Sequence, residues 1–251
     1  MKTKSAWLIL ACSLFLQVNA FGRDTNFFIF LCFGQSNMEG FPGIEAADKE
    51  PVDDRFQVLA AVDFANLGRT NGHWYNAVPP LCRGNSGLCP ADYFGRTLVA
   101  KLPVRIKVGV VNVSVAGCKI ELFDKLREQS YSSNAAPWMK NIIKTYGGSP
   151  YDHLVKLGRL AQQDGMIKGI LLHQGESNTN DKEWPDKVKA IYGNLLKDLD
   201  LKEAEVPLLA GEVVNMDQQG ACASMNAIIV GGSSKGDLRE SSKGDSKRVI
   251  S

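Results

Sequence analysis

The chain has 251 residues, of which 44% are hydrophobic, and its 29 lysines and arginines nearly balance its 27 acidic residues. This length suits one sizeable α/β domain, and the small net charge gives no basic surplus that would favour nucleic acid as a partner. Residues 1–20 have the pattern of a secretory signal peptide, because Lys2 and Lys4 precede a short apolar run and small residues end it. We therefore expect a secreted or periplasmic protein with no membrane span.

The cysteines fit an oxidising compartment, where disulfides are permitted. Cys82 and Cys89 close a short loop and are the most local candidate pair. Cys32, Cys118 and Cys222 lie in apolar contexts that are typical of core positions. No pair of cysteines has the close spacing of a zinc site, so neither a metal nor another cofactor is predicted.

Strand-like and helix-like segments alternate along the chain, which predicts a parallel sheet covered on both faces. The predicted strands cover 26–33, 55–62, 104–115, 169–172 and 206–211, and the predicted helices cover 91–102, 151–164, 184–199 and 221–230. Asn180 and Glu183 match a capping box before the third helix. Residues 63–90 and 119–149 read as long irregular stretches. Residues 231–251 are rich in Gly, Ser and charges and are expected to form a disordered tail, although 249–251 could begin one more strand.

The most informative feature is the turn that follows the first predicted strand. The apolar run 26–33 stops at residues 34–40 (GQSNMEG), which places Ser36 on a tight turn at the carboxyl edge of the sheet. A second block, 173–178 (HQGESN), follows another short strand, and residues 116–117 (AG) end the central one. A serine hydroxyl in such a place needs a base to become a nucleophile, and N–H donors to hold the developing oxyanion.

Together these blocks resemble the SGNH-hydrolase superfamily, specifically the branch of the sialate O-acetylesterase domain and the family 6 acetyl xylan esterases. The similarity covers residues 26–230. It implies one three-layer α/β/α domain over residues 21–230, with a mostly parallel, flavodoxin-like sheet. It also implies a secreted carbohydrate O-acetylesterase that removes acetyl groups from acetylated xylan or a related polysaccharide, with 9-O-acetyl sialic acid as the alternative substrate.

The resemblance assigns roles to particular residues. Ser36 corresponds to the nucleophile, and the oxyanion donors correspond to the N–H groups of Ser36 and Gly117 and the side-chain amide of Gln174. Glu176 is either a carboxylate that orients a catalytic histidine or one that ties two loops together through backbone N–H groups. Further candidates for contacts with the substrate are Asn37, His73 and Trp74. Trp74 and Trp138 are loop aromatics, which either stack on sugar rings or pack within the protein.

The general base is the open question. Members of this family carry an Asp-x-x-His block after one more strand, and no histidine follows His173 in this sequence. His173 is expected to be a structural imidazole bonded to backbone, and His153 to lie on the surface. Glu176 with His173 or His73 could supply the base instead. The alternative is an impaired, truncated esterase or a non-catalytic sugar-binding remnant. The oligomeric state is not predicted.

Overall fold

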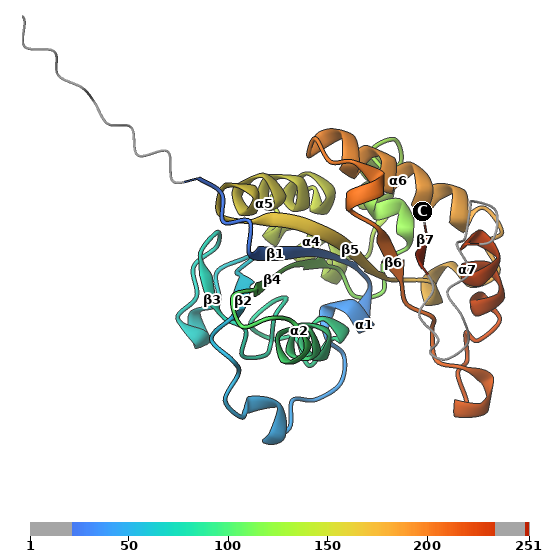
Figure 1. Cartoon of the computed structure of the whole chain (residues 1–251). Helices are drawn as coiled ribbons and strands as arrows, with labels where there is room; N and C mark the ends of the chain where they lie inside the picture. The colour runs from blue at the N-terminus through green and yellow to red at the C-terminus, as the bar shows by residue number, and fades with distance from the viewer. Residues whose placement is uncertain (1–21, 234–248, 251) are drawn as a thin grey trace, which may run out of the picture.

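The computed structural model describes residues 22–233 and 249–250, so the predicted signal peptide and most of the predicted tail lie outside the described residues. The described strands form one sheet in the order β3-β2-β4-β1-β5-β6-β7, with helices on both faces (Figure 1). The strands are β1 (Phe27–Gly34), β2 (Phe56–Leu59), β3 (Trp74–Asn76), β4 (Lys107–Ser114), β5 (Met166–His173), β6 (Leu208–Ala210) and β7 (Val249–Ile250). The helices are α1 (Ser36–Glu39), α2 (Pro90–Lys101), α3 (Glu128–Asn134), α4 (Pro137–Thr145), α5 (Pro150–Asp164), α6 (Trp184–Asp198) and α7 (Met225–Ser233). None of these helices is long and apolar enough to span a bilayer.

The predicted parallel sheet is confirmed. β1 pairs in parallel with β4 and β5, β5 continues in parallel to β6, and β2 runs parallel to β4. Among the described strands, the edge strands β3 and β7 are the antiparallel ones. The chain passes from β1 to β4 on one side and then returns to β5 on the other, as in flavodoxin-like sheets. Ligands of such sheets bind outside the carboxyl ends of the strands where the order reverses, which here is between β1 and β5.

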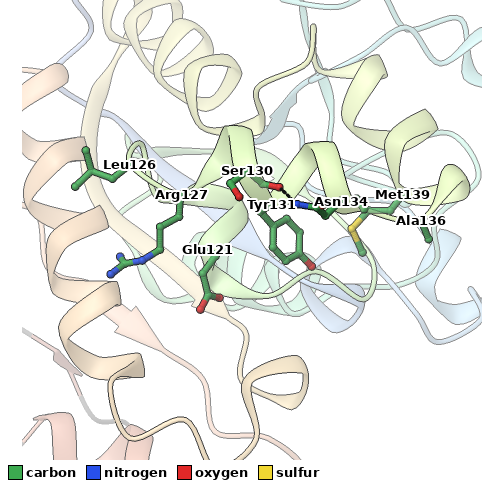
Figure 2. Close-up of a pocket in the computed structure, with 9 residues that line it drawn as sticks. Glu121, Leu126, Arg127, Ser130, Tyr131, Asn134, Ala136 and Met139 are labelled. Carbon is green, nitrogen blue, oxygen red and sulfur yellow. Dashed lines mark hydrogen bonds between the residues drawn. The ribbon is translucent and has the colours of Figure 1, made fainter.

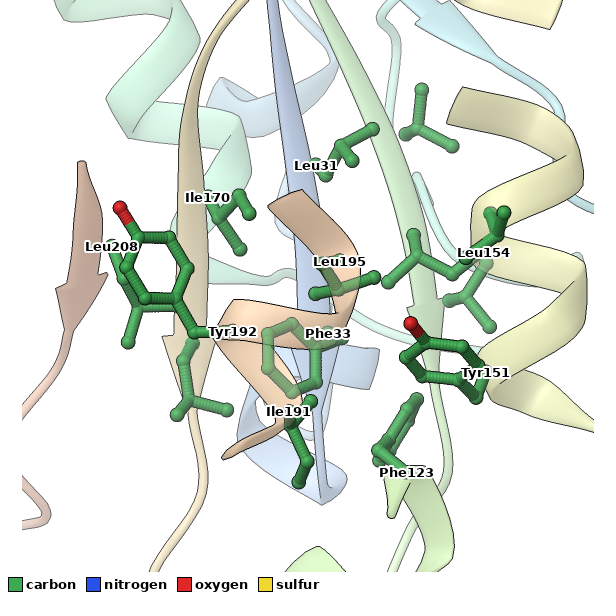
Figure 3. Close-up of a cluster of buried hydrophobic side chains, with 14 of the residues drawn as sticks. Leu31, Phe33, Phe123, Tyr151, Leu154, Ile170, Ile191, Tyr192, Leu195 and Leu208 are labelled. Atoms are coloured by element: carbon green, nitrogen blue, oxygen red, sulfur yellow. The ribbon is translucent and has the colours of Figure 1, made fainter. Parts of the chain in front are cut away.

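Two layers of buried side chains hold the helices on the sheet. Successive residues of a strand point to opposite faces. Leu31 and Phe33 of β1 therefore pack with α5 and α6, whereas Phe30 and Cys32 pack with α2. Figure 3 shows the first of these layers, in which Leu31 and Phe33 lie among side chains of both helices. Because both of its faces are buried, β1 is apolar along almost its whole length.

Residues 119–149 are more regular than predicted. They contain a 3-10 turn, η3 (Ile120–Phe123), and the short helices α3 and α4. No residue of α3 is fully buried, so no apolar periodicity marks it in the sequence. α4 begins at Pro137, a residue that suits the first helical position, and buries Met139 and Ile143. Two buried positions are too few to predict a helix from periodicity.

The capping box predicted before α6 is wrong. α6 starts after Glu183, and no side chain caps it. Asn180 instead adopts a left-handed conformation with φ of 68°, in the turn that precedes the helix. Short polar side chains such as asparagine tolerate this conformation, which is common in turns as well as at caps.

The predicted disulfide between Cys82 and Cys89 is also wrong. Both are free, buried thiols. The Cys89 thiol lies 3.3 Å from the carboxylate of Asp92, and burial raises the pKa of both cysteines. Cys32 and Cys118 are fully buried core residues, as predicted, whereas Cys222 is only partly buried.

Candidate active site

The turn after β1 is fixed by the backbone of β5. Gly34 ends β1 with φ of +154°, and a Cβ at this position would lie 2.2 Å from the carbonyl oxygen of His173. The next residue, Gln35, donates its N–H to that same carbonyl at 3.1 Å. Glycine alone permits this approach. The turn thus delivers Ser36 to the carboxyl edge of the sheet, beside β5, where the strand order reverses.

Ser36 is partly exposed and is the first residue of α1. Its hydroxyl has no hydrogen-bond partner within the part of the chain that the structure describes. Its N–H, like the first N–H groups of any helix, has no partner inside the helix. A hydroxyl and an N–H that are both unpaired suit a nucleophile that helps to hold its own oxyanion.

The turn after β4 places a second N–H nearby. Val115 donates its N–H to the carbonyl of Gly34 at 3.0 Å, and Ala116 donates to Oε2 of Glu39 at 2.6 Å. These bonds join this turn to the one that carries Ser36. Gly117 follows with φ of +66°, is exposed, and has an N–H without a partner among the described residues. An oxyanion donor needs an unpaired N–H near the nucleophile, and Gly117 meets both conditions. Its role as a donor stays a prediction.

Glu39 connects the two turns, and its role was not predicted. Its Oε1 forms an ion pair with Arg83, and the side chains of both residues are about nine-tenths buried. Burial opposes the charge of Arg83, but attraction to Glu39 holds the pKa of the guanidinium above its ordinary value. The one sequence feature that could have pointed to Glu39 is that it is the only charged residue in the glycine-flanked motif 34–40.

Gln174 lies in a fully buried hydrogen-bond network. Its amide nitrogen is 2.7 Å from Oδ1 of Asn178, 3.1 Å from Oε1 of Gln35 and 3.3 Å from the carbonyl of Cys118. The indole N–H of Trp184 donates to its carbonyl oxygen. Three buried acceptors therefore share the two amide hydrogens. The predicted oxyanion role of Gln174 stays a prediction, and its contacts in this structure hold the loop after β5.

Gln35 completes this network and was also missed from the sequence. Its Oε1 accepts hydrogen bonds from Gln174, from the N–H of Ser177 at 3.1 Å and from the N–H of Gly175 at 3.4 Å. The hydroxyl of Ser177 in turn donates to the carbonyl of Gly117 at 3.1 Å. The three sequence blocks thus meet in space.

Asn37, His173 and Glu176 form a second polar group beside Ser36. Asn37 donates its amide to Oε1 of Glu176 at 2.6 Å, and Nδ1 of His173 lies 4.0 Å from the same oxygen. Nδ1 of His173 and Oε2 of Glu176 are buried and have no hydrogen-bond partner among the described residues. The expectation that His173 is bonded to backbone is therefore wrong. Glu176 does tie two loops together, but through the side chain of Asn37 rather than through backbone N–H groups.

His73 and Trp74 are not brought to this site. The ring of Trp74 packs on Phe27 at 4.8 Å between centroids, and its indole N–H donates to Asp164 at 2.9 Å. Phe27 is the first residue of β1, so Trp74 lies at the end of the sheet opposite Ser36. His73 is exposed beside it, and its carbonyl accepts the N–H of Ala60.

His153 is buried, which corrects the expectation that it lies on the surface. A ring nitrogen lies 2.6 Å from the carbonyl of Ala61, and the ring packs near Tyr146. Burial lowers the pKa of this imidazole. His153 is therefore held as a neutral structural residue.

One cavity, of about 630 Å³, is lined by Met38 of the Ser36 turn and by His173. Two further cavities lie near the turns that carry Ser36 and Gly117. One, of about 500 Å³, is lined by Asn37 and His173 together with residues of α2 and of the segment after β6. The other, of about 560 Å³, lies between η3, α3 and the start of α4 (Figure 2). Both volumes fall within the range of small-molecule sites. Within the described ranges, no group of three or more His, Cys, Asp or Glu side chains is placed to hold a metal ion.

Comparison with known proteins agrees with this geometry. A family model described as "Carbohydrate esterase, sialic acid-specific acetylesterase" matches residues 26–232. A solved structure of a protein from Arabidopsis thaliana is similar, with a TM-score of 0.60 and 19% identity over 82% of this chain and 81% of that chain. XAC1771, a carbohydrate acetylesterase from Xanthomonas citri, has a TM-score of 0.54 and 20% identity, over 82% of this chain and 46% of that one. NanS has a TM-score of 0.58 and 18% identity, over 86% of this chain and 76% of that one. At these identities the solved structures show a shared fold.

Proposed function

Because the chain belongs to the carbohydrate esterase family of sialic acid-specific acetylesterases, we propose that it hydrolyses acetyl esters of carbohydrates with Ser36 as the nucleophile. Oγ of Ser36 attacks the acetyl carbonyl carbon, and the sugar oxygen leaves with a proton. Water then hydrolyses the acetyl-serine and releases acetate. The observation that carries this proposal is the hydroxyl of Ser36, which lies where the strand order reverses, near the N–H groups of Ser36 and Gly117. None of these three groups has a partner among the described residues.

The developing negative charge on the acetyl oxygen needs donors that are in place before the reaction. The N–H groups of Ser36 and Gly117 meet this need, because both belong to turns held by paired buried groups. Removing one such donor typically costs a hundredfold or more in kcat. Gln174 is the proposed third donor. To donate to the oxyanion, its amide would have to break a hydrogen bond to one of its three buried acceptors.

For the substrate we propose a neutral acetylated polysaccharide such as acetylated xylan, in an extracellular or periplasmic setting. The cavity beside Asn37 has no lysine or arginine in its described lining and includes Glu212. Such a lining offers no lysine or arginine to form an ion pair with the carboxylate of a sialic acid, and like charges disfavour each other. The family description names sialic acid, so 9-O-acetyl sialic acid is the alternative to be compared.

His173 is the histidine that we propose as the general base. The sequence contains three histidines, and the other two lie at the far end of the sheet or in a buried bond to backbone. His173 is the register partner of Gly34, two residues before Ser36, and Glu176 faces its Nδ1. We infer that this pair removes the serine proton. The competing interpretation is an impaired esterase that lacks a general base.

The deciding experiment compares the purified protein with Ser36→Ala on 4-nitrophenyl acetate, acetylated xylan and 9-O-acetyl sialic acid. We expect Ser36→Ala to lower kcat/KM by about a thousandfold or more, since the nucleophile is lost. Equal, slow hydrolysis by both proteins would contradict the esterase proposal and favour a sugar-binding protein.

The role of His173 is tested with His173→Ala and, as a matched control, His73→Ala. We expect His173→Ala to lower kcat by about a hundredfold or more, which is typical for loss of a general base. His73 is exposed and lies at the opposite end of the sheet, so its replacement should leave kcat unchanged. If the two variants behave alike, His173 is not the base.

A further inference from the structure

The two loop tryptophans that the sequence left equivalent differ sharply in the structure. Trp74 is tied down by Phe27 and Asp164, far from Ser36. Trp138 is 52% exposed and lies against the Gly117 turn. A Cβ on Gly117 would lie 3.0 Å from Cη2 of the Trp138 ring. The rim of this indole therefore touches the proposed oxyanion glycine, while about half of the side chain remains open to solvent.

The position of Trp138 is fixed by its helix. α4 starts at Pro137 and buries Met139 and Ile143 against the core, which anchors the helix. Trp138 lies next to this buried stripe and faces outward. A single exposed apolar residue is ordinary on a protein surface. An anchored tryptophan in contact with a catalytic turn calls for a functional reason.

The cavity of Figure 2 lies beside the start of the helix that carries this tryptophan, and the indole itself is not part of its lining. Met139 lines the cavity and also approaches the Gly117 turn, with its Cε 3.8 Å from where a Cβ of Gly117 would lie. Tyr131 lines it as well; its hydroxyl oxygen accepts the N–H of Lys119 at 3.0 Å, which leaves the hydroxyl hydrogen available. Asn134 is exposed at the rim. The lining thus combines apolar surface with a few polar groups, as in sites for uncharged small molecules.

The charges around this cavity are already paired. Arg127 forms an ion pair with Asp124. Glu121 accepts hydrogen bonds from Lys187 at 2.8 Å and from Asn178 at 3.1 Å. An uncharged ligand fits such a lining better than an anion or a cation does.

We propose that Trp138 and this cavity form a sugar-binding subsite of the esterase. The acetylated ring lays its C–H face on the indole, with its ester carbonyl at the N–H of Gly117, and the next ring of the same chain occupies the cavity beside Tyr131 and Asn134. The proposal rests on the proposed function, because it uses the Ser36 site to place the ester. With this subsite the enzyme would deacetylate oligosaccharides and polysaccharides in preference to acetylated monosaccharides.

A kinetic test compares Trp138→Ala and Trp138→Phe on acetylated xylo-oligosaccharides and on 4-nitrophenyl acetate, which has no sugar. We expect Trp138→Ala to raise KM for the oligosaccharides about tenfold, since loss of a large aromatic contact has an effect of that order. Trp138→Phe should recover much of this loss. For both variants the loss in kcat/KM should be smaller on 4-nitrophenyl acetate than on the oligosaccharides, because that ester has no sugar ring to stack. Val104→Ala is the control, because Val104 is 85% exposed and precedes β4 at the opposite end of the sheet.

A binding test separates this subsite from the esterase reaction. Calorimetric titration of Ser36→Ala with acetylated xylo-oligosaccharides needs no turnover, and Ser36→Ala/Trp138→Ala should bind about tenfold more weakly. Suppose that the Trp138 replacement weakens binding but the wild-type protein has no esterase activity. That result would support the subsite and contradict the proposed function. Unchanged binding and unchanged KM in an active enzyme, with equal melting temperatures, would overturn the subsite. A preference for acetylated monosaccharides or 9-O-acetyl sialic acid over oligosaccharides would overturn it too.

Discussion

The two sides of the Ser36 turn are built in opposite ways. On the side of Gly117, the carboxylate of Glu39 uses both of its oxygens, one on Arg83 and one on the N–H of Ala116. On the other side, Nδ1 of His173 and Oε2 of Glu176 are buried without partners among the described residues. Paired buried groups give a rigid arrangement, whereas unpaired ones are rare and are retained at sites with a chemical role. If the proposed roles hold, the Gly117 side is ready to bind the oxyanion before substrate arrives, and the His173 side is completed during reaction.

The largest expected effect is on the paired side. Glu39→Ala leaves the charge of Arg83 buried without its partner, and we expect a loss of about 3 kcal/mol in the free energy of unfolding. The N–H of Ala116 also loses its acceptor, so kcat should fall with stability. Chemical denaturation and steady-state kinetics measure both. Glu39→Gln is the matched control: it keeps an acceptor for Ala116 and should retain more activity than Glu39→Ala.

A smaller effect is expected at the glycine that Glu39 positions. Gly117→Ala forces a side chain onto a left-handed backbone, which costs about 1–2 kcal/mol, and places a Cβ 3.0 Å from the ring of Trp138. We expect kcat to fall about tenfold as the N–H shifts, with a modest loss of stability. A double-mutant cycle with Trp138→Ala isolates the steric part, because that replacement removes the ring. Full activity in Gly117→Ala would show that its N–H is not an oxyanion donor.

The smallest effect on stability is expected on the unpaired side. Glu176→Gln removes a buried oxygen that has no partner and leaves a carbonyl oxygen able to accept from Asn37, so the free energy of unfolding should change by less than about 1 kcal/mol. Its kcat should fall nevertheless, because the group facing His173 has lost its charge. A loss of stability as large as that of Glu39→Ala would mean that the two sides do not differ.

The central sheet and the Ser36 turn could be predicted because each has a pattern of residues that are consecutive in the sequence. β1 is an uninterrupted apolar run that ends at a glycine, and α6 repeats buried residues at helical spacing. Gln35 and Glu39 were missed because their partners lie far along the chain, at Gln174 and Arg83. Such contacts leave no trace in local periodicity. The same holds for the ring of His173, because the lack of a partner for Nδ1 among the described residues depends on how β5 meets the next loop.

Errors in assigning residues to the site came from treating sequence neighbours as spatial ones. His73 and Trp74 lie in a loop that looks like the rim of a cleft, but β3 attaches them to the sheet edge near the start of β1. Trp138 has the same local character, and α4 attaches it to the Gly117 turn. In each case the packing of the strand or helix that carries the tryptophan decides whether its side chain lies near Ser36.

The meeting of three turns at the carboxyl edge also bears on how the protein folds. The bond between the side chains of Gln35 and Gln174 joins residues 139 positions apart, and β1 makes its neighbours only after β4 and β5 have been added. Contacts of such long range close large loops and are slow to form. The reactive centre therefore assembles late, when the middle of the sheet is complete. During refolding, return of esterase activity should coincide with the slowest native signal, and no early intermediate should be able to turn over substrate.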